Sequence, residues 1–132
     1  MPPIIILLSL ILPSSSLTIF FFEGNVTCGL NQPFTYQIHV IEKDYGFHDA
    51  ISKASFINAP TSPSRYNITA VDTNDGMENY YFDIAFDVYH NCFPGGQHLK
   101  AHLFVKDFWI YSGTHYYTYD IDLTRRGVKF DW

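Results

Sequence analysis

The stretch LKAHLFV at residues 99–105 decides the fold class of this chain, because apolar side chains occupy every second position. Successive side chains of an extended strand point to opposite faces, so this period places one set of them on a core. The same alternation recurs at residues 36–40 and 117–123. All three stretches therefore predict strands that are buried on one face, as in antiparallel sheets.

The rest of the chain also has the composition of strands and turns. Aromatic residues make up 18% of the sequence, and they gather with β-branched residues in short runs, as strands favour. Further strands are predicted at residues 20–28, 55–57, 66–71 and 80–89, and turns at residues 31–33, 58–63, 74–76 and 93–96. One short helix is predicted at residues 49–54. Seven or eight short strands in one domain predict an all-β, antiparallel β-sandwich.

The N-terminal segment has the features of a secretory leader. Residues 1–22 carry no charged side chain, an apolar run covers residues 4–12, and small serines follow Pro13. We expect residues 1–16 to be a signal peptide cleaved after Ser16, which leaves one domain at residues 17–132. A membrane anchor is the alternative, although Pro13 and the serines interrupt its apolar length.

Secretion would place the two cysteines, Cys28 and Cys92, in an oxidising environment where cysteines usually pair. A disulfide between them closes a long loop, and the chain-entropy model gives such a bond an upper contribution of roughly 4 kcal/mol. Two separate free thiols are the alternative. The net charge of −5 and the scattered basic residues argue against nucleic acid as a partner.

The residues around the cysteines belong to a longer pattern. It consists of GNVTC at residues 24–28, Pro33, IHVIEKD at residues 38–44, Asp49, YHNC at residues 89–92, YDIDL at residues 119–123, Gly127 and Phe130. In order and spacing the pattern resembles the nematode transthyretin-like family, whose members are secreted proteins with a transthyretin (prealbumin-like) β-sandwich. The resemblance implies a secreted, extracellular, non-catalytic binding module that recognises an apolar ligand, a lipid surface or a protein partner.

The chain departs from the family pattern at several places. TSPSR at residues 61–65 replaces an acidic–polar–Asn–Gly turn, and Lys106 stands where many members have proline. The further cysteines that many members carry after the His-x-Cys step are missing. The chain therefore resembles a divergent member, for which we expect the fold but no inherited ligand specificity.

Six histidines raise the question of a metal site, but their spacing does not suit one. His98 and His102 stand four residues apart, which on a strand is roughly 13 Å at about 3.3 Å per residue. That separation is too long for two ligands of one zinc ion. His90 could bind a metal together with Cys92 only if the thiol stayed free. No metal or other cofactor is predicted, and we expect His90 to have a structural role at a strand end.

Known catalytic motifs are missing from the sequence, which has no Gly-x-Ser-x-Gly step, phosphate loop or His-Glu-x-x-His run. One enzyme remains as an alternative, because the transthyretin fold also serves 5-hydroxyisourate hydrolases, which carry a His-Val step in an early strand. His39-Val40 resembles that step, but the hydrolases end in Tyr-Arg-Gly-Ser and belong inside cells, whereas this chain ends in RRGVKFDW. We therefore expect a binding module rather than an enzyme. A secreted structural protein without a small ligand is a third alternative.

Two further features concern the surface of the domain. Sequons predict N-glycosylation at Asn25 and Asn67, of which Asn67 follows a Pro/Ser-rich turn and is expected to be the more accessible. The aromatic run FWIY at residues 108–111 is expected either to pack in the core or to form an exposed binding surface with Trp109 and Tyr111. The aromatic final strand could also pair with a second copy of the chain in a homo-oligomer.

Overall fold

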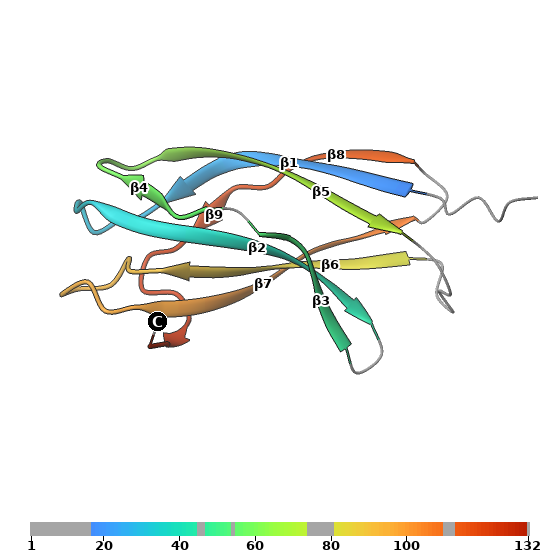
Figure 1. The fold of residues 1–132 in the computed structure, drawn as a ribbon. Helices are drawn as coiled ribbons and strands as arrows, with labels where there is room; N and C mark the ends of the chain where they lie inside the picture. The colour runs from blue at the N-terminus through green and yellow to red at the C-terminus, as the bar shows by residue number, and fades with distance from the viewer. Residues whose placement is uncertain (1–16, 45–46, 54, 74–80, 110–112, 132) are drawn as a thin grey trace, which may run out of the picture.

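A computed structural model describes residues 17–44, 47–53, 55–73, 81–109 and 113–131. The described chain forms two β-sheets that lie face to face, as the two layers in Figure 1 show. The strands are β1 (Leu17–Thr27), β2 (Phe34–Asp44), β3 (Phe47–Lys53), β4 (Ile57–Ala59), β5 (Ser64–Thr73), β6 (Tyr81–His90), β7 (Leu99–Trp109), β8 (Thr114–Thr118), β9 (Ile121–Asp122) and β10 (Val128–Lys129). The prediction of an all-β sandwich is confirmed, but the described residues form ten strands where seven or eight were expected.

The smaller sheet has the strand order β5-β1-β8, and β9 also pairs with β1. The larger sheet has the order β10-β7-β6-β2-β3, and β4 pairs with β2. Every pairing in the larger sheet is antiparallel, but β1 runs parallel to both β8 and β9. The expectation of antiparallel strands is therefore confirmed for most pairings and wrong for those of β1 with β8 and β9. β8 follows β7, which lies in the other sheet, so β8 is not joined to β1 by a hairpin. A hairpin would require the two strands to run antiparallel, and without one they can run parallel.

The strand alternation read from the sequence is seen in the burial of side chains. Residues 99–105 lie in β7, where Leu99, Ala101, Leu103 and Val105 are buried and His102 and Phe104 are exposed. Residues 36–40 lie in β2, with Tyr36, Ile38 and Val40 in the core. The predicted strands at 20–28, 66–71 and 80–89 correspond to β1, β5 and β6.

Three local expectations differ from the structure. Residues 49–53 of the predicted helix belong to β3, an edge strand that pairs with β2, while residue 54 lies outside the described residues. The predicted strand at 117–123 is interrupted between β8 and β9 at Tyr119 and Asp120. The strand expected at 55–57 is displaced to Ile57–Ala59. For β3 and β4, hydrogen bonding to β2 overrides a weak local preference.

Aromatic rings join the two sheets in the core. Phe20 of β1 makes edge-on contacts with Phe82 of β6 and Phe108 of β7, at ring-centre distances of 5.4 Å and 5.3 Å. Phe22 makes a similar contact with Phe86 at 5.1 Å. These three contacts hold β1 against β6 and β7, and edge-on geometry is one of the favoured arrangements of aromatic pairs.

The predicted leader at residues 1–16, the turn at 74–76 and Tyr111 lie outside the described residues. Cleavage of the leader and its function therefore stay predictions.

Candidate functional site

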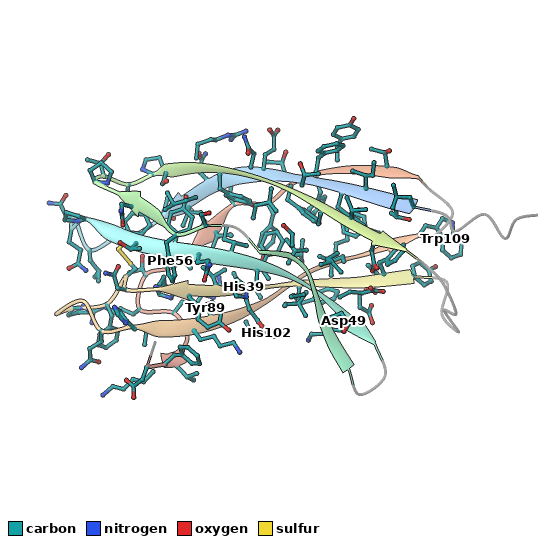
Figure 2. The ribbon with its side chains drawn as sticks, in the orientation of Figure 1. His39, Asp49, Phe56, Tyr89, His102 and Trp109 are labelled. Atoms are coloured by element: carbon teal, nitrogen blue, oxygen red, sulfur yellow. A yellow bond between two sulfur atoms is a disulfide. The ribbon has the colours of Figure 1, made fainter. Side chains whose placement is uncertain are left out.

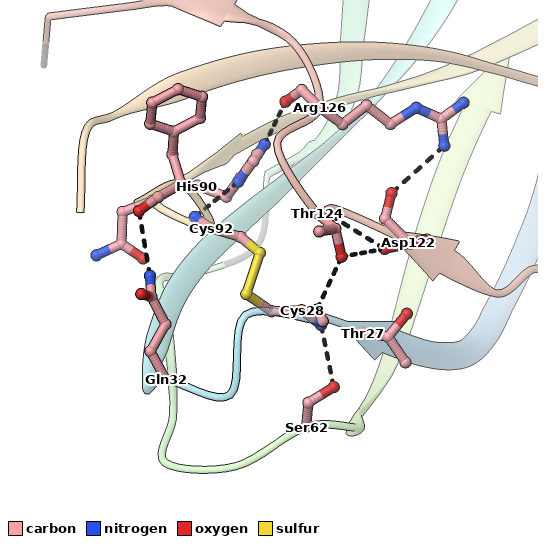
Figure 3. Close-up of a disulfide and its surroundings, with 12 residues drawn as sticks. Thr27, Cys28, Gln32, Ser62, His90, Cys92, Asp122, Thr124 and Arg126 are labelled. Atoms are coloured by element: carbon pink, nitrogen blue, oxygen red, sulfur yellow. Dashed lines mark hydrogen bonds between the residues drawn. A yellow bond between two sulfur atoms is a disulfide. The ribbon is translucent and has the colours of Figure 1, made fainter. Parts of the chain in front are cut away.

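One end of the sandwich is closed by a disulfide between Cys28 and Cys92, so the predicted pairing is confirmed (Figure 3). Cys28 follows β1 of the smaller sheet and Cys92 follows β6 of the larger sheet, and their Cα atoms are 5.8 Å apart. The backbone N–H of Cys28 donates to Ser62 Oγ, and the backbone carbonyl of Cys92 accepts from the N–H of Arg125. The bond therefore connects the two sheets at a point where other loops also meet.

His90 is fully buried beside this disulfide and has partners for both ring nitrogens. Its Nδ1 accepts a hydrogen bond from the backbone N–H of Cys92 at 3.0 Å, so Nε2 carries the proton and donates to the carbonyl of Arg126 at 2.7 Å. Burial lowers the pKa of His90, while the bond to Arg126 opposes that shift. The neutral ring thus connects the end of β6 to the C-terminal segment, which is a structural role.

The outer face of the larger sheet carries a group of side chains that we call the aromatic–ionic patch. Tyr89 of β6 lies at its centre, with the rings of His39 and Phe130 at centre-to-centre distances of 4.8 Å and 5.0 Å. The ammonium of Lys100 lies 5.5 Å from the centre of the Tyr89 ring. The members of the patch are His39, Asp87, Tyr89, Lys100, His102 and Phe130. Figure 2 shows His39, Tyr89 and His102 close to one another along the middle of the large sheet.

Three strands supply this patch because their registers match. His39 of β2 lies directly opposite Asp87 of β6, which in turn lies opposite His102 of β7. Asp87 accepts from Nδ1 of His102 at 2.5 Å and lies 3.8 Å from the ammonium of Lys100. Phe104, the next outward residue on β7, is 57% exposed. The patch thus combines aromatic rings, which protein interfaces favour, with an Asp87–Lys100 ion pair.

The Asp87–His102 pair has the form in which a carboxylate orients a catalytic imidazole. His102 is exposed to water, however, and exposed side chains do not build the dry, enclosed surroundings that strengthen such chemistry. His39, the residue of the hydrolase-like step, lies on the same face in contact with Tyr89.

The outer face of the smaller sheet carries a second candidate surface, a hollow of about 470 Å³. Its floor and rim include Phe21 and Glu23 of β1, Asn67 and Thr69 of β5, and Tyr116 and Thr118 of β8. The rings of Phe21 and Tyr116 stack at 5.0 Å, and Tyr116 is 78% exposed. We call this feature the Phe21–Tyr116 hollow.

Both predicted glycosylation residues lie on the outer face of the smaller sheet. Asn67 of β5 is exposed and lies opposite Glu23 of β1, whereas Asn25 is half-buried and lies opposite Arg65. The backbone N–H of Asn25 donates to Asp120 Oδ1 at 2.9 Å. The two sequons thus mark one face of the sandwich, and whether they carry glycans stays a prediction.

The aromatic run at residues 108–111 is divided between the core and the surface. Phe108 is buried, while Trp109 is 48% exposed and stacks on Tyr81 at 4.5 Å. Trp109 lies at the end of the sandwich opposite the disulfide (Figure 2). Tyr111 lies outside the described residues, so a binding surface formed by Trp109 and Tyr111 stays a prediction.

Sequence reasoning did not identify the two surfaces described above. The aromatic–ionic patch depends on the register of three strands, and the Phe21–Tyr116 hollow depends on the parallel pairing of β1 with β8. One signal in the sequence could have indicated part of the patch. Residues 87, 89, 100 and 102 alternate with apolar, buried positions, so their side chains are expected on the outer face of the sheet. Nothing in the sequence indicated which strands are neighbours.

Two searches of the described residues concern metals and membranes. No three His, Cys, Asp or Glu side chains in the described ranges are placed to share a metal ion. Within the same part of the chain, no helix is long and apolar enough to cross a membrane.

Comparison with known proteins gives one relative of partial coverage. An uncharacterized protein of Caenorhabditis elegans is 34% identical to this chain over 73 residues, which is 55% of the chain and 54% of the relative. The chain thus spans about half the length of the curated relative that it matches. No protein-family model matches the chain. No solved structure matches it.

Proposed function

We propose that this chain is a secreted, extracellular, non-catalytic binding module with a transthyretin-like β-sandwich, and that it recognises a protein partner through the aromatic–ionic patch. The observation that carries the proposal is the position of Tyr89 on the outer face of the larger sheet, in contact with His39, Lys100 and Phe130. Tyrosine and other aromatic residues are enriched in binding surfaces because they combine apolar area with a polar tip.

The transthyretin-like part of the proposal draws on the resemblance of the sequence and on the strand order. An immunoglobulin constant-type sandwich places its first two strands in one sheet. In this chain β1 and β2 lie in different sheets, and β1 lies between β5 and β8. The strand order therefore argues against the commonest sandwich topology. The disulfide supports an oxidising environment, as secretion would supply.

The choice of the larger sheet draws on the position of the sequons. Both Asn25 and Asn67 lie on the smaller sheet, so glycans on a secreted chain would cover that face. The outer face of the larger sheet keeps Phe104 and Phe130 exposed together with charged groups. A partner with exposed apolar side chains would match this combination.

The test compares capture of extracellular proteins by the wild-type chain with capture by variants. We expect Tyr89→Ser and Phe130→Ser to abolish stoichiometric capture of at least one protein from the fluid of the source tissue, measured by cross-linking and mass spectrometry. Tyr116→Ser, an exposed aromatic change on the opposite face, is the matched control and should keep capture. An identical captured set for all four proteins would contradict the proposal.

The hydrolase alternative has its own experiment. Purified protein is incubated with 5-hydroxyisourate, and absorbance is followed with His39→Gln and His102→Gln as variants. Turnover at enzymatic rates that either substitution removes would replace the binding proposal with the enzymatic one. Native mass spectrometry of the secreted protein distinguishes the remaining alternatives, because a retained apolar ligand or a homo-oligomer changes the mass.

A further inference from the structure

We propose that an N-glycan on Asn67 lies in the Phe21–Tyr116 hollow, with its first N-acetylglucosamine packed against the ring of Phe21. This inference rests on the proposed secretion, because only a chain that enters the secretory pathway receives such a glycan. It goes beyond the sequon itself, since it assigns a place on the protein to the first sugar and an occupant to the hollow.

The first observation is the position of the sequon in the sheet. Asn67, Ile68 and Thr69 all line the hollow, with Asn67 and Thr69 exposed and Ile68 buried. Asn67 lies opposite Glu23 and Thr69 lies opposite Phe21, so Asn67 is the diagonal neighbour of Phe21. Diagonal residues on adjacent strands are about 7–8 Å apart. A sugar attached to the Asn67 amide therefore begins beside the Phe21 ring.

The second observation is the direction of the aromatic faces. Phe21 and Tyr116 lie opposite each other on β1 and β8, and their rings are nearly parallel, with 16° between their planes. Their centre distance of 5.0 Å is close to the spacing between neighbouring strands. One face of the Phe21 ring is thus covered by Tyr116, and the other face is directed toward β5, where Asn67 lies. The apolar C–H face of a pyranose ring packs well on such an aromatic face.

The third observation explains why the space beside Asn67 is open. The carboxylate of Glu23 lies 3.4 Å from the guanidinium of Arg65, which is the next outward residue of β5 on the side away from Thr69. This ion pair draws the Glu23 side chain away from Phe21. Thr69 and Thr118 remain at the rim, where their hydroxyls can bond to sugar hydroxyls. The hollow is therefore bordered by an aromatic face and by polar groups, as a sugar requires.

The experiment uses the full chain secreted from a eukaryotic host, with Asn25→Gln to remove the second sequon. An endoglycosidase trims the Asn67 glycan to its first N-acetylglucosamine, and NMR measures the proton shifts of that sugar and its contacts with aromatic protons. We expect cross-peaks between the sugar and the Phe21 ring, and upfield shifts of the sugar protons. Phe21→Leu, which keeps an apolar side chain, should remove the upfield shifts.

Two variants control for the glycan itself. Thr69→Ser keeps the sequon and should keep the shifts, whereas Thr69→Ala removes the sequon and should leave Asn67 without sugar. An occupied Asn67 whose sugar has the shifts of a freely mobile glycan would overturn the inference, as would an unoccupied Asn67 in secreted protein. A heterologous leader directs secretion of this sample, so the NMR test does not depend on residues 1–16. If the chain's own leader fails to direct secretion, that result counts against the proposed secretion and not against the position of the glycan.

Discussion

Tyr89 and His90 are neighbours in one strand, but Tyr89 lies on the outer surface and His90 lies in the core. Tyr89 points outward and contacts His39, Lys100 and Phe130, while His90 points inward and bonds to Cys92 and Arg126. The sequence predicted a structural His90 at a strand end, and its two backbone partners confirm that role. It did not predict the contacts of Tyr89, because these come from strands β2, β7 and the C-terminal segment.

The burial of His90 predicts a pH dependence of stability. The folded pKa of His90 is lowered, so below about pH 6.5 the unfolded chain binds a proton there that the folded chain resists. The free energy of unfolding should therefore fall as the pH drops below that value. Protonation would also remove the acceptor that Nδ1 offers to the N–H of Cys92.

Urea unfolding between pH 5 and pH 8 (an interval chosen to span the ordinary histidine pKa of about 6.5) measures this effect. His90→Gln should give a flatter dependence on pH than the wild type, at lower overall stability. His102→Gln removes an exposed imidazole and controls for the general loss of a histidine. Equal slopes for His90→Gln and the wild type would contradict the assignment.

At the scale of elements, the connection between β8 and β9 explains the glycine that opens the GNVTC pattern. A Cβ on Gly24 would lie 2.1 Å from the carbonyl oxygen of Tyr119, because this connection lies against β1 there. The N–H of Tyr119 donates to the carbonyl of Glu23, and its own carbonyl accepts from the hydroxyl of Tyr66. The strand that the sequence predicted at residues 117–123 is interrupted at this close approach.

Replacement of Gly24 by alanine should therefore destabilise the fold. The added methyl group meets backbone atoms, which cannot turn away as a flexible side chain can, so we expect a loss of about 1–3 kcal/mol or more. Gly113→Ala is the matched control, because nothing lies within 4 Å of a Cβ built there. Chemical unfolding of both variants checks the prediction, and equal stabilities would show that this close approach of the two backbones tolerates a side chain.

The positions of most strands could be predicted from the sequence, but the pairing of strands with one another could not. Alternation identified the core residues of β2 and β7, since burial on one face imposes a period of two. The edge strand β3 was mistaken for a helix because residues 49–54 have no clear period, and only its hydrogen bonds to β2 define it. The candidate surfaces depend on partnership, which explains why residue patterns did not reveal them.

At the scale of the whole molecule, the disulfide fixes one end of both sheets while the opposite end is held by packing. Cys28 and Cys92 are separated by 64 positions in the sequence, and the chain between them supplies β2 to β6. The bond therefore restricts the unfolded chain over about half of its length. In the chain-entropy account, such restriction is the main source of a disulfide's stabilisation.

The double variant Cys28→Ala/Cys92→Ala tests this contribution. We expect the free energy of unfolding to fall by roughly 2–5 kcal/mol, as is usual when a small secreted domain loses a native disulfide. Chemical unfolding of the variant is compared with that of wild-type protein in reductant, which should lose a similar amount. A change of less than about 1 kcal/mol would show that packing alone closes this end.

The same covalent loop decides how the protein would respond to a mechanical pull on its two ends. Force applied at Leu17 and at the C-terminal segment passes along β1 to Cys28, crosses the sulfur bridge to Cys92, and leaves through β7 to β10. The chain between the two cysteines, from β2 through β6, lies outside that path. Stretching would therefore detach β1 and the C-terminal strands. The segment from β2 to β6 would not extend under force until the disulfide was reduced.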